Sequence, residues 1–543
     1  MRDLVAGLCV AGILLPEAVA YAGLAHLPVA HALTGTLVGL AVYGVLGGSR
    51  FAIVAPTSST AALCAAAALS LAAPLGAVPT AGAYSQALLA LVLASGAMLG
   101  LLALARQGQL SSFVSRPVLR GFAFALAITI VIKQLPDALG LTLSAGWGRD
   151  PGHLLWYAVT HLPEWQLPSM AVALAAAVLL VLLKRWPQVP ASLLVMVIAL
   201  FAAQTLPLQV WGVQEIGSFE RPAFRLAWPE LPFADWLRVV ELSFGLVMLV
   251  FAESWGSMRS EALQHGDRLD ANRELAVLGV CNMGSALFQG MAVGAGFSAT
   301  AANAGAGAQS RVAGLVALAV VSAALVWALP ALHFLPRPVL AVVVISALWH
   351  ALSPGPILAL WRMNRDRLLI VAAAVAVLCF GVLDGLLAAI GLSVLAALQR
   401  FSQPVVHELG ELGSTRNFVD VVTQHGAAAL PGLLILRPEE PLFFGSAERV
   451  TNEVLDRVKM RTGVRAVVLS LEESADLDST AVECLMELDQ ALRRDGKILL
   501  LARAKTTLRE LMGRWDPQGL GNADRLFWSV ADAVQFLSDR PRP

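Results

Sequence analysis

Long apolar runs separated by short loops fill the first 400 residues of this 543-residue chain. Each run is roughly 17–24 residues long, which is the length that an α-helix needs to cross the hydrocarbon core of a bilayer. The whole chain is 57% hydrophobic and only 14% charged, which is typical of polytopic membrane proteins and not of soluble enzymes. We therefore predict a polytopic α-helical membrane protein with fourteen transmembrane segments, which start near residues 4, 31, 51, 84, 117, 168, 190, 237, 275, 294, 311, 336, 367 and 383.

The Lys and Arg residues between these segments predict the orientation of the chain. With the N-terminus inside, fifteen of these cations fall on the inner side and six on the outer side. An excess of cations in the cytoplasmic loops is the positive-inside rule. We expect a multi-pass protein of a bacterial-type inner (plasma) membrane, with both termini in the cytoplasm.

The composition changes near residue 401, and the rest of the chain has the pattern of a soluble domain. Apolar runs alternate there with amphipathic stretches, in the order 432–438, 447–460, 466–472, 479–494, 497–504 and 506–515. Strand–helix–strand order with short connections predicts a small α/β domain. We expect a transmembrane domain over 1–400, a linker over 401–414 and a cytoplasmic α/β domain over 415–540.

A short motif occurs twice in the transmembrane domain. The pattern S-x-T-A-A stands at 58–62 and again at 298–302, each time just after residues that interrupt a regular helix. These breakers are Pro56 in the first copy and Gly294 and Gly296 in the second. We interpret the two copies as half-helices 3 and 10 of a repeat of seven plus seven segments. Because seven is odd, the two halves have inverted topology.

Inverted repeats of this kind place a substrate near the membrane midplane, between broken helices whose N-termini point at it. Free backbone N–H groups and the partial positive charge of a helix start attract an anion, and hydroxyl side chains add donors. The alternative is that small and hydroxyl residues only allow close helix packing. We predict an anion site formed by Thr57, Ser58, Ser59, Thr60, Gly296, Phe297, Ser298, Ala299 and Thr300.

Two carboxylates interrupt otherwise apolar segments. Glu17 lies in the first segment and Glu253 in the eighth, one repeat unit apart. Because burial favours the neutral form of a carboxyl, both are candidate coupling residues that could carry a proton. If Na⁺ drives transport instead, ionised Glu253 is the candidate metal ligand. The alternative for Glu17 is a side chain that reaches the membrane interface from near a helix end.

Several motifs in this order resemble the sulfate permease (SulP) anion transporters with a C-terminal STAS domain. The resemblance rests on LLPEAVAYAGLAHLPV, VYGVLGGSRFAIVAPTSS, SRPVLRGFAFALAITIVIKQLPDALG and RLDANRELAVLGVCNMGSALFQG, followed by GFSATAANAGAGAQSRVAG. It implies core helices 1–4 and 8–11 that move against gate helices 5–7 and 12–14, and a homodimer. Many members carry an Arg where this chain has Ala299, so a direct salt bridge to the anion is not expected here.

The stretch ADLDSTAVECL resembles the strand-to-helix turn Asp-Ser-Ser-Gly of anti-sigma-factor antagonists, which are also STAS domains. Asp478, Ser479 and Thr480 occupy the turn, with Ala481 where Gly is usual. A helix start with hydroxyls could accept a phosphate or contact a cytoplasmic regulator. The simpler interpretation is a helix N-cap, in which the side chain of Asp478 or Ser479 accepts first-turn amides.

The function that we expect is secondary active transport of a small inorganic or carboxylate anion, driven by H⁺ or Na⁺. Sulfate is the first candidate, followed by bicarbonate and C4-dicarboxylates. The alternatives are a nucleobase permease of the same architecture, an uncoupled anion exchanger or channel, and a membrane-anchored regulator. The chain contains no recognisable catalytic set and no nucleotide-binding motif, so we expect neither an enzyme nor a cofactor. The formal net charge of zero gives no reason to expect nucleic acid as a partner.

Overall fold

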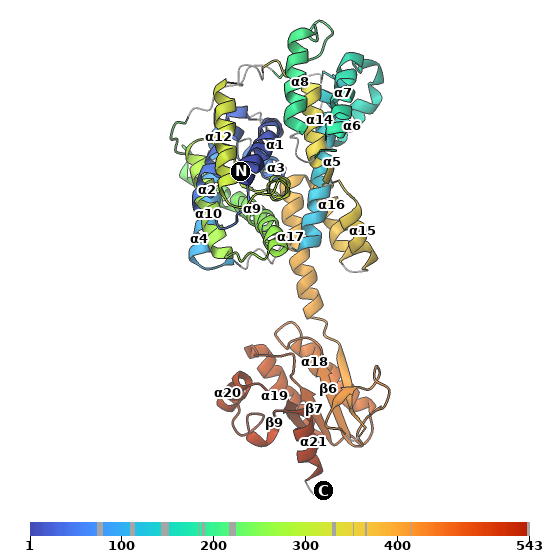
Figure 1. The fold of residues 1–543 in the computed structure, drawn as a ribbon. Coiled ribbons are helices and arrows are strands. Elements are labelled where there is room, and N and C mark those ends of the chain that lie inside the picture. The colour runs from blue at the N-terminus through green and yellow to red at the C-terminus, as the bar shows by residue number, and fades with distance from the viewer. Residues whose placement is uncertain are drawn as a thin grey trace. The chain divides into compact units, whose positions relative to one another are not determined.

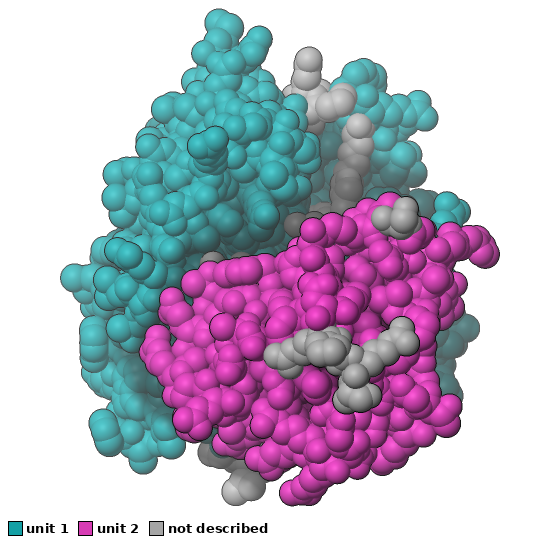
Figure 2. Space-filling view, turned by 90° about the horizontal axis from the view of Figure 1, so that it is seen from below, with its two compact units in different colours: residues 1–393 teal, residues 394–543 magenta. Residues whose placement is uncertain are grey.

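The computed structural model divides into two compact units, residues 1–393 and 394–543 (Figures 1 and 2). Each unit is described below by itself. The structure describes residues 1–25, 27–72, 80–108, 115–142, 151–183, 185–186, 191–216, 224–327, 333–350, 352–363, 366–413 and 415–539.

The first half of unit 1 is helical except for one short strand. Long apolar helices alternate here with two shorter, interrupted stretches. The elements are α1 (Arg2–Leu24), α2 (Val29–Leu46), β1 (Val54–Ala55), α3 (Ser58–Ala72), α4 (Ala81–Leu104), α5 (Arg116–Leu139), α6 (Pro151–Thr160), α7 (Leu167–Leu183) and α8 (Ala191–Thr205).

The second half repeats this order. It also has a two-residue strand followed by a short helix near its beginning. The elements are α9 (Trp236–His265), α10 (Ala271–Leu287), β2 (Gly294–Ala295), α11 (Phe297–Gly305), α12 (Val312–Trp327), α14 (Arg337–Ala347), α15 (Gly355–Arg362), α16 (Arg367–Phe380) and α17 (Val382–Phe401).

A described helix lies at or just after each predicted segment start, so the helical membrane fold is confirmed. Five helices in the described ranges are long and apolar enough to cross a membrane, in α1, α2, α4, α5 and α17. Shorter apolar helices occupy most of the other positions. The count of fourteen membrane crossings stays a prediction.

The helix contacts come in reciprocal pairs between the two halves. Helix α4 packs on α10 while α2 packs on α12, and α1 packs on α11 while α3 packs on α9. Further along, α5 packs on α16 while α7 packs on α14. In Figure 1 the labels α1–α4, α9, α10 and α12 gather in one bundle, and α5–α8 with α14 and α16 in another. Two interleaved halves of inverted topology produce this pattern of contacts.

Glycines allow α4 and α10 to approach each other closely. A Cβ added at Gly96 would lie 2.6 Å from the backbone N of Met283 and 2.9 Å from the carbonyl O of Gly279. One added at Gly279 would lie 2.9 Å from the backbone N of Gly100. Small residues at a helix interface let the two backbones come together, which is how membrane helices gain packing contacts.

Unit 2 is an α/β domain around a seven-stranded sheet. Its main path runs β4-β3-β6-β7-β8-β9, with β5 paired to β3. Strands β6, β7, β8 and β9 are parallel, and β3 pairs antiparallel to β4, β5 and β6. The strands are β3 (Val406–Leu412), β4 (Phe418–Asp420), β5 (Ala427–Ala428), β6 (Leu433–Pro438), β7 (Ala466–Ser470), β8 (Ile498–Ala502) and β9 (Leu526–Phe527).

The helices of unit 2 confirm the predicted alternation. They are α18 (Ala447–Met460), α19 (Ser479–Arg494), α20 (Thr506–Trp515) and α21 (Val530–Ser538). One boundary differs from the expectation, because β3 lies inside the stretch 401–414 that we expect to be a linker. Its backbone pairs with β4 and β6, and Val406 and Leu409 are buried, so these residues belong to the sheet.

We predict that Gly96→Ala destabilises the protein because the new methyl group meets the backbone of α10. Overpacking of this kind costs about 1–3 kcal/mol. The measurement is the thermal unfolding midpoint of the purified protein in detergent. Gly100→Ala on the same helix is the matched control, since its added Cβ has no atom within 4 Å in the described structure. Equal midpoints for the two variants would contradict the close approach.

Candidate functional site

The two interrupted segments meet at the centre of the repeat. Strands β1 and β2 pair antiparallel, with Val54 opposite Ala295 and Ala55 opposite Gly294. Helix α3 begins three residues after β1, and α11 begins two residues after β2. The pairing therefore holds the N-termini of the two half-helices close to each other.

Two threonines stabilise the start of α3. The Oγ1 of Thr57 accepts from the backbone N–H of Thr60 at 3.2 Å, and the Oγ1 of Thr60 accepts from that of Thr57 at 2.9 Å. This reciprocal arrangement caps first-turn amides that have no partner within the helix. The Thr60 hydroxyl also donates to the carbonyl of Ala292, beside β2, at 3.2 Å. Thr60 is fully buried, so its hydroxyl acts within the protein framework.

The carboxylate of Glu253 lies at the start of α3. Its Oε2 accepts from the hydroxyl of Ser59 at 2.9 Å and from that of Thr57 at 3.3 Å. Glu253 belongs to α9, in the second half of the repeat, whereas its two partners belong to the first half. Within the described part of the chain, the half-buried Ser58 has no hydrogen-bond partner for its hydroxyl.

The start of α11 is less enclosed. Gly296 is the N-cap, and a Cβ there would lie 3.0 Å from the side chain of Thr57, so only glycine fits without displacing it. Phe297 and Ser298 are exposed, while Ala299 and Thr300 are buried. The Thr300 hydroxyl accepts from the backbone N–H of Ile53, just before β1, at 3.4 Å.

The hydroxyl of Ser298 faces the second carboxylate. It donates to Oε1 of Glu17 at 3.4 Å, and Glu17 is 7% exposed. Glu17 lies on α1, in the first half, and Ser298 in the second half. Each carboxylate therefore contacts a half-helix that belongs to the other half of the repeat. The structure brings Glu17, Glu253 and the hydroxyl motifs together, and their roles in substrate and ion binding stay predictions.

Three further residues, for which the sequence patterns predict no role, support this arrangement. Tyr21 is buried and lies near the carboxylates of both Glu17 and Glu253. The Ser254 hydroxyl accepts from the backbone N–H of Ala295 at 2.9 Å, and the Ser257 hydroxyl donates to the carbonyl of Gly296 at 3.4 Å. Each of the three lies within about one helical turn of Glu17 or Glu253, and this spacing is the sequence feature that could have identified them.

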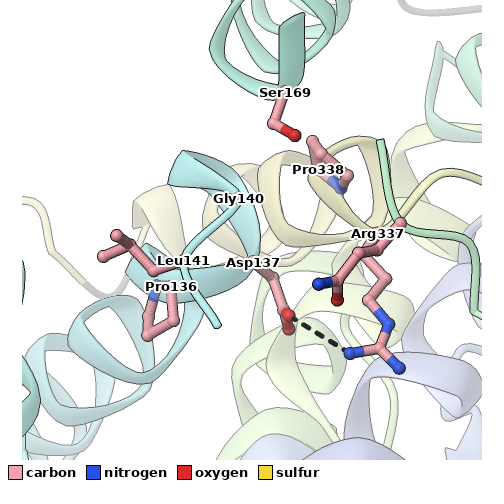
Figure 3. Close-up of a pocket in the computed structure, with 8 residues that line it drawn as sticks. Pro136, Asp137, Gly140, Leu141, Ser169, Arg337 and Pro338 are labelled. Carbon is pink, nitrogen blue, oxygen red and sulfur yellow. Dashed lines mark ion pairs between the residues drawn. The ribbon is translucent and has the colours of Figure 1, made fainter. Parts of the chain in front are cut away.

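A second polar feature of unit 1 joins α5 to α14 (Figure 3). The guanidinium of Arg337 lies 3.9 Å from the carboxylate of Asp137, beside Gly140 and Ser169. Arg337 also donates from Nε to the carbonyl of Glu215 at 3.1 Å. Both side chains of the ion pair are more than 40% exposed, so the pair contributes little to stability. We interpret it as a connection between helices and not as a substrate site.

In unit 2 the turn before α19 is a helix cap. The Oδ1 of Asp478 accepts from the backbone N–H of Ala481 at 2.8 Å, and its Oδ2 accepts from that of Phe444 at 2.7 Å. This is the simpler of the two expected interpretations for Asp478. Ser479 and Thr480 are exposed at the surface of the unit.

Comparisons with known sequences agree with this architecture. Residues 1–374 match the Sulfate permease family, and residues 424–533 match the STAS domain. A probable sulfate transporter of Mycobacterium tuberculosis is 30% identical over 545 residues, which cover 99% of this chain and 95% of the relative. Sulfate transporter 2.2 of Arabidopsis thaliana is 26% identical, over 98% of this chain and 82% of its own length.

Solved structures show the same fold. The murine Solute Carrier 26 family member A9 anion transporter, in its inward-facing state, superposes with a TM-score of 0.89 at 22% identity. That match covers 99% of this chain and 91% of the murine one. The transmembrane domain of the cyanobacterium bicarbonate transporter BicA matches 72% of this chain and 96% of its own, with a TM-score of 0.61 at 21% identity.

The sequence, the interleaved helical halves and these matches agree on one assignment. The chain belongs to the sulfate permease family of anion transporters, which are multi-pass membrane proteins and not enzymes, and it carries a C-terminal STAS domain.

Proposed function

We propose that the protein is a secondary active transporter that moves a small anion by symport with H⁺ or Na⁺. The substrate binds between the N-termini of α3 and α11. Sulfate is the first candidate because the mycobacterial and plant relatives are named as sulfate transporters. Bicarbonate and C4-dicarboxylates follow, the former because BicA is named as a bicarbonate transporter.

The attraction for the anion comes from helix starts and hydroxyl groups. Each helix N-terminus presents unpaired N–H groups and about half a positive charge. Ser58 and Ser298 add hydroxyl donors that are not completely enclosed by the protein. The position after Ser298 is Ala299, which is buried and carries no cation. Binding by oriented dipoles therefore replaces binding by a salt bridge.

The contact of Glu253 with Ser59 and Thr57 is the observation that carries the coupling proposal. An ionised carboxylate there uses hydroxyl donors that an incoming anion needs, and it repels that anion. A proton or Na⁺ on Glu253 removes this negative charge. Anion and cation therefore bind together more favourably than either binds alone, which is the thermodynamic requirement for symport.

The competing functions differ in what the site must recognise or couple. A nucleobase permease needs donors and acceptors for the edges of a base, whereas the motifs around α3 and α11 offer mainly hydroxyl groups. An uncoupled exchanger or channel would leave the positions of Glu17 and Glu253 without a role. A membrane-anchored regulator would need neither paired half-helices nor buried carboxylates.

We also propose a homodimer in the inner membrane with both termini in the cytoplasm. The exposed hydroxyls of Ser479 and Thr480 are candidates for contact with a cytoplasmic regulator or for phosphorylation. Truncation after residue 400 tests the role of the STAS domain. Loss of transport, together with partners that bind only through 415–540, would favour the membrane-anchored regulator instead.

We predict that Glu253→Gln weakens coupling, because glutamine can neither take up a proton nor balance the charge of Na⁺. Wild-type proteoliposomes should take up labelled sulfate faster with an inward H⁺ or Na⁺ gradient. In the variant, the factor by which the gradient accelerates uptake should be about ten times smaller than in the wild type. Glu241→Gln, an exposed carboxylate on the same helix, is the matched control. Wild-type uptake that responds to neither gradient would exclude symport and favour exchange or a leak.

We predict that Ser58→Val combined with Ser298→Val weakens anion binding. A lost hydrogen bond to a charged group costs about 1.5–3 kcal/mol, so the dissociation constant should rise at least tenfold. Ligand-induced thermal shift measures binding, with sulfate compared to uracil. Ser322→Val on α12, outside the site, controls for the added volume. Unchanged affinity would place the anion elsewhere, and stabilisation by uracil alone would favour the nucleobase permease.

A further inference from the structure

The two carboxylates hold equivalent positions at the two half-helices. Glu253 contacts Ser59 at 2.9 Å at the start of α3, and Glu17 contacts Ser298 at 3.4 Å at the start of α11. Each contact joins a carboxylate of one half to a hydroxyl of the other half, although the repeat aligns Ser298 with Ser58 and not with Ser59. The proposed site for a single anion therefore faces two carboxyl groups, one at each half-helix, and each is negatively charged when it is ionised.

In the described part of unit 1, neither carboxylate forms an ion pair with a cation. Helices α3, α11 and α12, which pack around α1 and α9, contain no charged residue. Other helices that contact α1 and α9 carry His31 on α2, Arg337 on α14, and Arg273 and Glu274 on α10. Among the described residues, no ion pair includes Glu17 or Glu253, and the titratable group near both is Tyr21.

Charge balance then constrains what can bind. A divalent anion beside two ionised carboxylates would place four negative charges in a low-dielectric region with only helix dipoles to oppose them. One monovalent cation would leave one carboxylate ionised at one of the half-helices. Two cations neutralise both carboxylates and leave both helix starts free for the anion.

We propose that each divalent anion is transported with two monovalent cations, one at Glu17 and one at Glu253, so that the transport cycle moves no net charge. The cation is a proton or Na⁺ at both positions. This inference rests on the proposed symport of a divalent anion such as sulfate, and it adds the stoichiometry.

The test is the equilibrium accumulation of labelled sulfate in proteoliposomes of the full-length wild-type protein. Separate arms impose a tenfold inward gradient of H⁺ or of Na⁺, and K⁺ with valinomycin sets the membrane potential. With two cations, one gradient should concentrate sulfate about 100-fold, and an interior-negative potential of about 59 mV should leave this unchanged. With one cation, accumulation is about tenfold and the same potential reduces it by a further factor of about ten.

Two variants assign the cations to their carboxylates. Glu17→Gln and Glu253→Gln should each lower accumulation from about 100-fold to about tenfold and make it sensitive to the potential. Glu241→Gln should retain the wild-type value. Full accumulation with either carboxylate removed would overturn the assignment.

The wild-type measurement decides the stoichiometry even if a variant fails to fold. Tenfold, potential-sensitive accumulation would overturn this inference while leaving the proposed symport intact. No gradient-driven uptake by the folded wild-type protein would overturn both proposals.

Discussion

The pairing of β1 with β2 is the interaction on which the proposed site depends. A helix that breaks inside a membrane exposes backbone N–H and C=O groups to a region without water, and each unpaired group is costly. Val54 and Ala55 meet this requirement by pairing with Ala295 and Gly294 from the other half of the chain. The same pairing brings the starts of α3 and α11 together. The broken helices therefore stabilise each other and form the proposed anion site.

In the proposed mechanism, the carboxylates are the groups that couple the anion to a cation. Two helix starts with hydroxyl groups attract anions in general, whereas Glu17 and Glu253 oppose any anion that arrives without a cation. Their contacts cross between the two halves of the repeat, and the four helices that carry them, α1, α3, α9 and α11, all belong to the predicted core. In the proposed mechanism, binding of the substrate and binding of the cation are then linked by the same few hydrogen bonds.

Much of the fold could be predicted because it follows from local patterns. The length of the apolar runs, the repeat of S-x-T-A-A and the strand–helix alternation after residue 401 each reflect short-range requirements of a bilayer or a sheet. The half-helix starts were predictable from Pro56 and Gly296 for the same reason. Strand β3 could not be predicted in the same way, because its pairing partners lie elsewhere in the chain and no local pattern reveals them.

The sequence by itself determined that this chain spans a membrane, contains two inverted halves and places hydroxyls and carboxylates in equivalent segments. Only the tertiary structure decided which groups meet. It paired Glu253 with Ser59 and not with the neighbouring Ser58, placed Thr60 in the framework, and joined Glu17 to a residue 281 positions away. These contacts depend on the angles at which the helices cross and on how each helix is rotated about its axis. Side-chain packing across the whole unit sets that geometry.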